Sequence, residues 1–227
     1  DKIVPGMYNA MVRLNIPAIY VSGGPMLAGC DRTDLISVFE GVGKHSVGKL
    51  STEKLEKLTE CACPGYGSCS GMFTANSINC LGEVLGFALP GNGTIPATKR
   101  NKNKLRQFEI NPERVKLVKQ SAETVVKLVK NKIRPLDILN KRSIDNAFVL
   151  DMAMGGSSNT VLHLLALANE AGISYDLKRI DQISKSTPNV IKIAPSRPEV
   201  HVEDVHKIGG MGAILKEVKN RVKNFLD

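Results

Sequence analysis

Apolar side chains recur along much of the chain at the three- and four-residue intervals of amphipathic helices. This spacing predicts helices over 5–15, 33–42, 51–60, 72–89, 143–153, 160–171, 201–207 and 212–224. A longer helix is predicted from Asn111-Pro112, because Asn is a good N-cap and Pro suits the first helical turn. Its expected apolar seam is Val115, Val118, Ala122, Val125 and Val129.

Short β-type runs lie between these helices. Pro17 to Val21 is one such run and stops at a glycine-rich loop, Ser22-Gly23-Gly24, while Ile191 to Ala194 is another. The order helix, strand, glycine loop is typical of a parallel α/β sheet with a site at the carboxyl end of a strand. The pattern therefore predicts an α/β fold in which parallel-sheet layers are flanked by helices.

Charge is the first feature that composition adds to this picture. The chain has 31 Lys+Arg against 22 Asp+Glu, a net charge of +9. Lys99 to Arg142 alone holds 14 basic and 4 acidic groups, a local +10, and the remainder is at −1. Because the excess surrounds one predicted amphipathic helix and aromatic residues make up only 4%, we expect a solvated basic face and no nucleic-acid partner.

Targeting signals are the next feature to consider. No stretch approaches the roughly 20 apolar residues that a membrane helix needs. The first residues also lack the pattern of a signal peptide. We therefore expect no membrane partner and a cytoplasmic location, or an organellar one if the source is a eukaryote.

The five cysteines suggest a candidate site. An odd number of cysteines without a secretory signal argues against a disulfide framework, and no paired zinc spacing is present. Cys69 lies in a Gly- and Pro-rich loop just before a predicted helix, where backbone N–H groups stabilise a thiolate. It is the best candidate metal ligand. The other four are expected to be structural: Cys30, Cys61, Cys63 and Cys80.

The histidines and glycine turns give weaker signals. His163 lies on an apolar helix and is predicted to be a core residue, whereas His201 and His206 flank acidic residues and are predicted to lie on a solvated face. Three turns could cradle a carboxylate or phosphate, but an ordinary turn or helix cap is the better interpretation of each: Ser22-Gly23-Gly24, Gly91-Asn92-Gly93 and Gly155-Gly156-Ser157-Ser158.

Longer motifs occur in one order along nearly the whole chain. They are Asp-Lys-Ile-Val-Pro-Gly-Met at 1–7, Arg-Leu-Asn-Ile-Pro at 13–17, Val-Ser-Gly-Gly-Pro-Met at 21–26, Cys-Pro-Gly-Tyr-Gly-Ser-Cys-Ser-Gly-Met-Phe-Thr-Ala-Asn-Ser at 63–77, Ala-Leu-Pro-Gly-Asn-Gly-Thr at 88–94 and Leu-Asp-Met-Ala-Met-Gly-Gly-Ser-Ser-Asn-Thr-Val-Leu-His-Leu-Leu at 150–165. Together they resemble the dihydroxy-acid dehydratases. The motifs at 13–26 favour the branched-chain amino-acid enzyme over its sugar-acid relatives.

This resemblance implies a metal site. Asp1 would be a magnesium ligand, and Lys2 would be one through a carbamate on its side-chain nitrogen, which turns a cation into an oxygen donor that Mg²⁺ accepts. Cys69 would ligate an iron–sulfur cluster, 2Fe-2S or 4Fe-4S. No catalytic residue is expected in this chain, because the family's serine base, its first cluster cysteine and a further acidic magnesium ligand would lie outside it.

The resemblance also implies a reaction. It is the dehydration of 2,3-dihydroxy-3-methyl carboxylates to 2-oxo acids in valine and isoleucine biosynthesis, a hydro-lyase activity. The cluster would remove the 3-hydroxyl while magnesium holds the small-molecule substrate. Two alternatives stay open: a sugar-acid (phosphogluconate-type) dehydratase, which would share Asp1, Lys2 and Cys69, and a non-enzymatic basic nucleic-acid-binding module.

Family members are longer than this chain, so the chain is expected to be a fragment of the N-terminal α/β domain. Two similar subdomains, about 1–95 and 136–227, would be joined by a basic helical segment, with the C-terminal domain absent. The fragment alone is predicted to be inactive, and the full-length protein to be a homodimer.

Overall fold

Helices make up most of the computed structural model, which describes residues 2–101 and 104–221. They are α1 Ile3–Leu14, α2 Leu35–Ser46, α3 Thr52–Ala62, α4 Thr74–Val84, α5 Pro112–Lys130, α6 Pro135–Ile138, α7 Lys141–Met154, α8 Asn159–Glu170, α9 Leu177–Ser186, α10 Val202–Lys207 and α11 Gly210–Glu217. Short 3-10 turns form at η1, Cys30–Arg32, and η2, Lys219–Arg221. Each predicted helix is confirmed, with ends shifted by a few residues, except that residues 222–224 of the predicted helix 212–224 lie outside the described residues. Helices α6 and α9 were not predicted.

Local sequence explains where several helices begin. The Ser51 side chain accepts the N–H of Lys54, and the Asn111 side chain accepts the N–H of Glu113, so both predicted starts are confirmed. Asp34 caps α2 in the same way by accepting the N–H of Ser37. Such side chains satisfy N–H groups that have no partner within the helix.

The predicted parallel-sheet layers are wrong. Within residues 2–101 and 104–221 the sheet has two strands, β1 Thr98–Asn101 and β2 Lys104–Ile110, which pair antiparallel. The runs 17–21 and 191–194 are not strands; each bonds to a loop, as when Tyr20 N–H donates to the Phe87 carbonyl at 2.7 Å. A strand needs a neighbouring chain along its length, which an apolar run alone does not supply.

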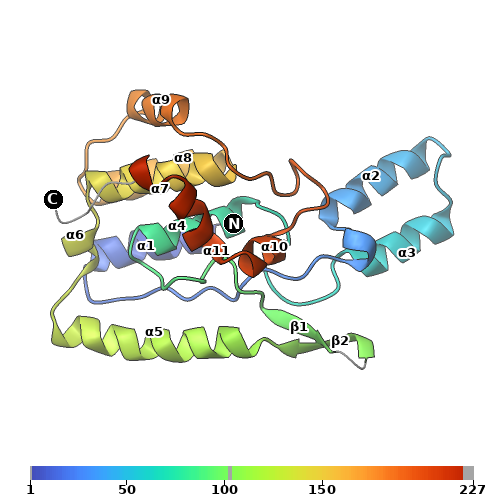
Figure 1. The fold of residues 1–227 in the computed structure, drawn as a ribbon, viewed down its shortest axis with the longest axis horizontal. Coiled ribbons are helices and arrows are strands. Elements are labelled where there is room, and N and C mark those ends of the chain that lie inside the picture. The colour runs from blue at the N-terminus through green and yellow to red at the C-terminus, as the bar shows by residue number, and fades with distance from the viewer. Residues whose placement is uncertain (1, 102–103, 222–227) are drawn as a thin grey trace.

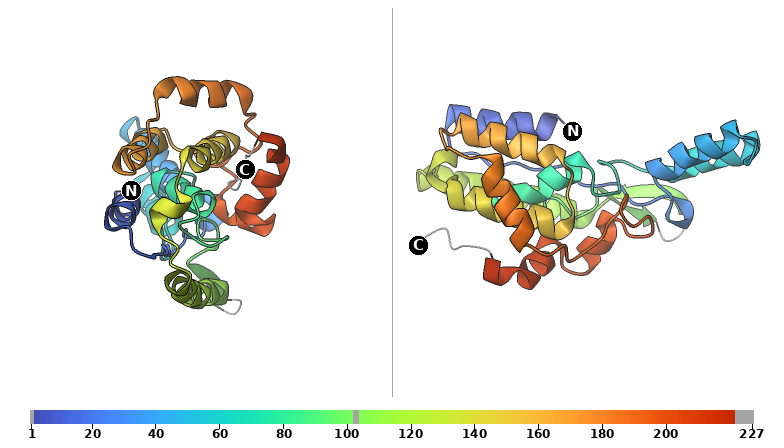
Figure 2. Two further views of the ribbon diagram at one scale, coloured as in Figure 1. Left: turned by 90° about the vertical axis from the view of Figure 1, so that its left-hand side faces the viewer. Right: turned by 90° about the horizontal axis from the view of Figure 1, so that it is seen from above.

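One hydrophobic core brings together helices that lie far apart in the sequence. It is built mainly from α1, α4, α7 and α8, which lie side by side in Figures 1 and 2. The Tyr8 ring of α1 packs edge-on against Tyr20 and Phe87, with ring centroids 5.2 and 5.4 Å apart. Each large apolar side chain that is fully buried contributes about 1.5–3 kcal/mol to stability.

Helix α5 lies along one edge and faces the body with residues other than those predicted (Figure 1). Its buried residues are Arg114, Leu117 and Ser121, whereas Val115, Val118 and Val129 of the expected seam are exposed. The cause is Arg114, because its guanidinium donates hydrogen bonds to three loop carbonyls. These bonds fix which side of α5 faces the body. Those carbonyls belong to Ser22, Asn92 and Ile95.

The surface of the described residues adds two observations. No helix among them is both long and apolar enough to cross a membrane. The α5 lysines at 116, 119, 127 and 130 are exposed, in keeping with the expected solvated basic face.

Candidate functional site

The loop between α3 and α4 is fixed to the body by backbone hydrogen bonds. Met26 N–H donates to the Ser68 carbonyl at 2.8 Å, and Ser68 N–H donates to the Gly24 carbonyl at 3.0 Å. Gly67 lies at this contact with φ of +126°, and a Cβ there would be 2.6 Å from Met26 N. Only glycine allows so close an approach with that backbone.

Asn76, in the first turns of α4, sets the shape of the loop around Cys69. Its fully buried amide donates to the carbonyls of Cys69 and Gly71, the latter at 2.7 Å. Its oxygen accepts the Ser68 hydroxyl at 2.5 Å. One side chain thereby ties three loop residues to the helix, which fixes the backbone that carries the cysteine.

The Cys69 thiol is half-buried, and its surroundings shift its pKa in both directions. Burial raises its pKa above the ordinary value, while hydrogen bonds from the Gly71 and Ser70 N–H groups favour the thiolate. Asp34 and Cys63 lie near enough to raise that pKa further. A thiol that meets two N–H groups in this way suits a metal ion, whose charge offsets the cost of a buried thiolate.

Polar side chains meet where α4 and α8 begin. Thr74 Oγ1 lies 3.1 Å from Ser157 Oγ and accepts from Asn159 Nδ2 at 2.9 Å. Ser77 Oγ accepts the Ser157 N–H at 3.0 Å. Small polar residues at the starts of two separate helices thus form one hydrogen-bonded group beside the Cys69 loop.

Asp151 of α7 is a buried acid behind this group. It accepts the Thr160 hydroxyl at 2.6 Å, and its other oxygen has no hydrogen-bond partner among the described residues. Burial raises its pKa to about 7, although the hydrogen bond from the Thr160 hydroxyl opposes this rise. A Cβ at Gly156 would collide with this carboxylate, so the glycine of the turn is required by packing rather than by an anion.

The predicted magnesium ligands lie at the start of α1. Asp1 falls outside the described residues. Lys2 is exposed and precedes α1 as its N-cap. Its charge adds to burial in lowering the pKa of His163 on α8, a helix that packs against α1. His163 is buried as predicted, but its Nε2 has no hydrogen-bond partner among the described residues.

His201 is fully buried, so its predicted place on a solvated face is wrong. Its Nε2 lies 3.5 Å from Oδ2 of the buried Asp34. The next residue, Val202, donates its N–H to the Ser70 carbonyl at 2.9 Å and so braces the Cys69 loop. No local pattern could have found this, because the partners lie over 100 residues apart in sequence.

The cysteine count also misled the sequence prediction. Cys30 and Cys61 form a disulfide with Cα atoms 5.5 Å apart, the usual separation for such bonds. An odd count does not exclude a pair, and here η1 and the end of α3 bring two of the five together. Cys80 is buried as predicted, and Cys63 is free and exposed.

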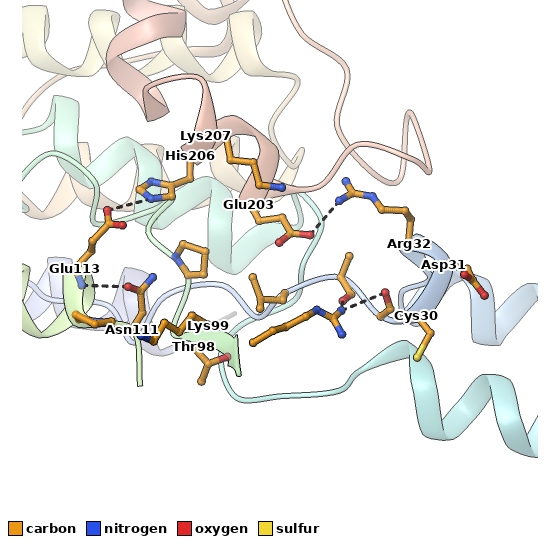
Figure 3. Close-up of a pocket in the computed structure, with 16 residues that line it drawn as sticks. Cys30, Asp31, Arg32, Thr98, Lys99, Asn111, Glu113, Glu203, His206 and Lys207 are labelled. Carbon is orange, nitrogen blue, oxygen red and sulfur yellow. Dashed lines mark hydrogen bonds and ion pairs between the residues drawn. The ribbon is translucent and has the colours of Figure 1, made fainter. Parts of the chain in front are cut away.

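A cavity of about 920 Å³ opens beside η1, β1 and α10 (Figure 3). Four of its ionisable side chains form two pairs: Arg32 with Glu203 at 3.1 Å and His206 with Glu113 at 3.2 Å. Neither Lys2 nor Cys69 is among its lining residues. Because this cavity contains none of the residues that the family resemblance implies, the Cys69 loop is the stronger candidate site.

The side chains present indicate whether this site could hold a metal cofactor. Cys69 fits a thiolate ligand to iron, through its N–H contacts and fixed backbone. Across residues 2–101 and 104–221, no group of three or more His, Cys, Asp or Glu side chains is placed to hold a metal ion. The described residues therefore fit one position of a cluster, not a complete set of ligands.

A helical protein that holds a half-buried cysteine in a fixed loop fits the class of proteins in which a thiolate binds a metal or reacts with an electrophile. The particular family follows from comparison with known proteins. The family model described as Dihydroxy-acid/6-phosphogluconate dehydratase N-terminal matches residues 1–227. The chain belongs to this family, a superfamily of dehydratases (hydro-lyases).

Proposed function

We propose that this chain provides metal-binding residues of a dehydratase that converts 2,3-dihydroxy-3-methyl carboxylates to 2-oxo acids, as in valine and isoleucine biosynthesis. The observation that carries the proposal is the Cys69 thiol, held by Asn76 and facing two backbone N–H groups. Family membership indicates the class of reaction, a dehydration. The Cys69 thiol indicates where in the chain a metal cofactor would bind.

Cys69 would hold an iron–sulfur cluster, with Ser70 and Gly71 N–H groups stabilising its thiolate. When bound, such a cluster supplies a Lewis-acidic iron that helps a hydroxyl leave as hydroxide. The protein's part is positioning: the Asn76 amide and the Val202 N–H hold the loop from two sides. The position of a ligand held this way changes little when substrate binds.

Lys2 and Asp1 would hold magnesium at the start of α1, Lys2 as a carbamate. An unmodified ammonium repels Mg²⁺, and carboxylate-type oxygens bind it. Burial, together with the Lys2 charge, lowers the pKa of His163 on α8, which favours a neutral imidazole there.

The alternative is a phosphogluconate-type dehydratase, since the family includes both activities. The sequences Arg-Leu-Asn-Ile-Pro and Val-Ser-Gly-Gly-Pro-Met support the branched-chain substrate through their resemblance to that enzyme. We propose a cytoplasmic or organellar location for either activity.

A substrate comparison on the intact protein, purified anaerobically, tests the proposal. We expect 2-oxo acid formation from 2,3-dihydroxy-3-methylbutanoate and little from 6-phosphogluconate. Cys69→Ser should abolish turnover, whereas Cys63→Ser, which alters an exposed thiol in the same loop, should retain most of it. Preference for 6-phosphogluconate would favour the alternative, and an active Cys69→Ser enzyme would contradict both.

A further inference from the structure

The Cys30–Cys61 disulfide lies at the surface of the molecule. Cys30, the first residue of η1, is exposed, and Cys61, near the end of α3, is half-buried. Figure 3 shows the Cys30 side chain directed toward α3. An exposed disulfide is open to attack by a thiolate and is more easily reduced than a buried structural one. This bond is therefore a candidate for exchange with another thiol.

A cavity of about 550 Å³ opens beside this bond, between η1, α3 and the strands β1 and β2. Both cysteines of the disulfide line the cavity, and Leu58, Pro64 and Phe108 supply its apolar surface. Pockets that bind small molecules have volumes of roughly 300–1,000 Å³. A small thiol compound can therefore be held in the cavity while it reacts with the disulfide.

The charges around the cavity favour an anionic ligand. Its three basic side chains outnumber its two acidic ones, which gives a net charge of +1 in a chain that is itself at +9. They are Lys54, Lys57 and Arg100 against Asp31 and Glu60. In the part of the chain that the structure describes, neither lysine forms a salt bridge. Both ammonium groups can therefore attract an anion into the cavity.

Lys57 is also placed to assist thiol chemistry. It precedes Cys61 by four residues on α3, so the two side chains are neighbours on one face of that helix. Lys54 lies three residues before Lys57, on the same face. A nearby ammonium group stabilises a thiolate. This arrangement favours departure of the Cys61 sulfur when the disulfide is attacked at Cys30.

The two segments that carry the cysteines are packed against each other independently of the bond. A Cβ atom at Gly29 would collide with the Cys61 carbonyl, so only glycine fits this contact. Arg100 donates to the Ala28 carbonyl at 2.5 Å, and its guanidinium lies 5.6 Å from the centre of the Phe108 ring. The cysteines therefore stay close together after the bond opens, which allows it to form again.

We propose that this cavity binds a small anionic thiol, which exchanges with the Cys30–Cys61 disulfide. The thiolate forms a bond to the Cys30 sulfur, and the electron pair of the old S–S bond leaves on the Cys61 sulfur as a thiolate beside Lys57. One disulfide replaces another, so this step involves no net oxidation. A second thiol molecule then releases the first as a small-molecule disulfide, which oxidises the two thiols and reduces both cysteines.

Neither Cys69 nor Lys2 lines this cavity. Failure of this proposal would therefore leave the proposed dehydratase function untouched.

Reduced glutathione, an anionic thiol, is the probe that tests the proposal. The folded, intact protein is incubated with it in the absence of oxygen, quenched with N-ethylmaleimide and mapped by peptide mass spectrometry. We expect glutathione on Cys30 and maleimide on Cys61. The free thiols Cys63, Cys69 and Cys80 should carry no glutathione, because two thiols join only when an oxidant is present.

Matched double variants test the role of charge. Lys54→Gln with Lys57→Gln changes the net charge of the lining from +1 to −1 and should slow the exchange about tenfold. Lys127→Gln with Lys130→Gln removes two exposed lysines with the same spacing on α5 and should leave the rate unchanged. Cysteamine, a cationic thiol, should react more slowly than glutathione when the rates are compared per thiolate.

Circular dichroism shows that each variant is folded, which we expect because all four lysines are exposed. Absence of glutathione from Cys30 in the folded protein overturns the proposal, whatever the denatured protein does. Equal exchange rates for the two double variants also overturn it, because the cavity would then not attract the thiol. A faster reaction with cysteamine than with glutathione has the same consequence.

Discussion

Asn76 holds the Cys69 loop with three hydrogen bonds from one buried amide. Asn76→Ala leaves the carbonyls of Cys69 and Gly71 without these donors in a buried setting. We expect a loss of about 3 kcal/mol in the free energy of unfolding, measured by urea denaturation. Asn169→Ala, on an exposed position of α8, is the control and should change it by less than about 0.5 kcal/mol. Equal stability of the two variants would show that the loop is held by other contacts.

Glu83 makes stability depend on pH. Burial raises its pKa from 4.5 to about 7, while hydrogen bonds from the Gly93 and Gly91 N–H groups and the Arg114 charge oppose this shift. Between these two values the folded chain binds more protons than the unfolded chain. The contribution of Glu83 is therefore fully present below pH 4.5 and is lost as pH rises through 7. Ionisation of Glu83 should lower the free energy of unfolding by about 3 kcal/mol between pH 4.5 and pH 7.

Glu83→Gln isolates the effect, because glutamine keeps an oxygen for the Gly93 N–H but does not ionise. The variant should gain stability relative to the unaltered chain as pH rises from 4.5 to 8, measured by urea denaturation at each pH. Asp151, whose pKa is also raised to about 7, titrates in both proteins and cancels in the comparison. A difference that does not vary with pH would refute the assignment to Glu83.

At the residue scale, sequence predicted what depends on local context. The glycine-rich loop around Cys69 and the cap at Asn111 are features of neighbouring residues. Asn76 and His201 could not be found this way, because their roles depend on contacts with the loop and with Asp34 that only the fold creates. Two acidic neighbours make His201 look like a surface residue in the sequence.

Arg114 positions helix α5. Replacing Arg114 should weaken the attachment of two glycine turns at once. Arg114→Met takes the donor away from the carbonyls of Ser22, Asn92 and Ile95 while keeping much of the side-chain volume. We expect a loss of about 3–5 kcal/mol in the free energy of unfolding. Lys119→Met, on the exposed side of the same helix, should cost less than about 0.5 kcal/mol. If the two variants unfold alike, the helix is held by its apolar contacts instead.

At the scale of elements, helices were predictable and their partners were not. Periodicity and caps are local, so they marked most helices to within a few residues. The α5 seam was displaced because Arg114 gains more from three buried hydrogen bonds than the valines gain from burial. The sheet failed for a related reason, since the run at 17–21 has no strand beside it in the described part of the chain.

At the scale of the whole molecule, the Cys30–Cys61 disulfide joins residues 31 positions apart and closes a loop that contains α2 and most of α3. Restricting the unfolded chain in this way should stabilise the fold by about 3–4 kcal/mol. Alkylation of the denatured, unreduced chain should label three of its five cysteines, with the remaining two appearing after reduction. The double variant Cys30→Ser, Cys61→Ser should lose most of that stability in urea denaturation. Labelling of all five thiols without reduction would exclude the bond.

The family match places this chain in the dehydratase superfamily. The central claim is that Cys69 ligates an iron–sulfur cluster. Iron and acid-labile sulfide per chain, measured on the intact protein purified anaerobically together with its visible spectrum, test this claim most directly. We predict that the unaltered protein and Cys63→Ser both contain iron, sulfide and visible absorption, and that folded Cys69→Ser lacks them. A folded, colourless, iron-free unaltered protein, or a Cys69→Ser protein with undiminished iron and sulfide, would contradict it.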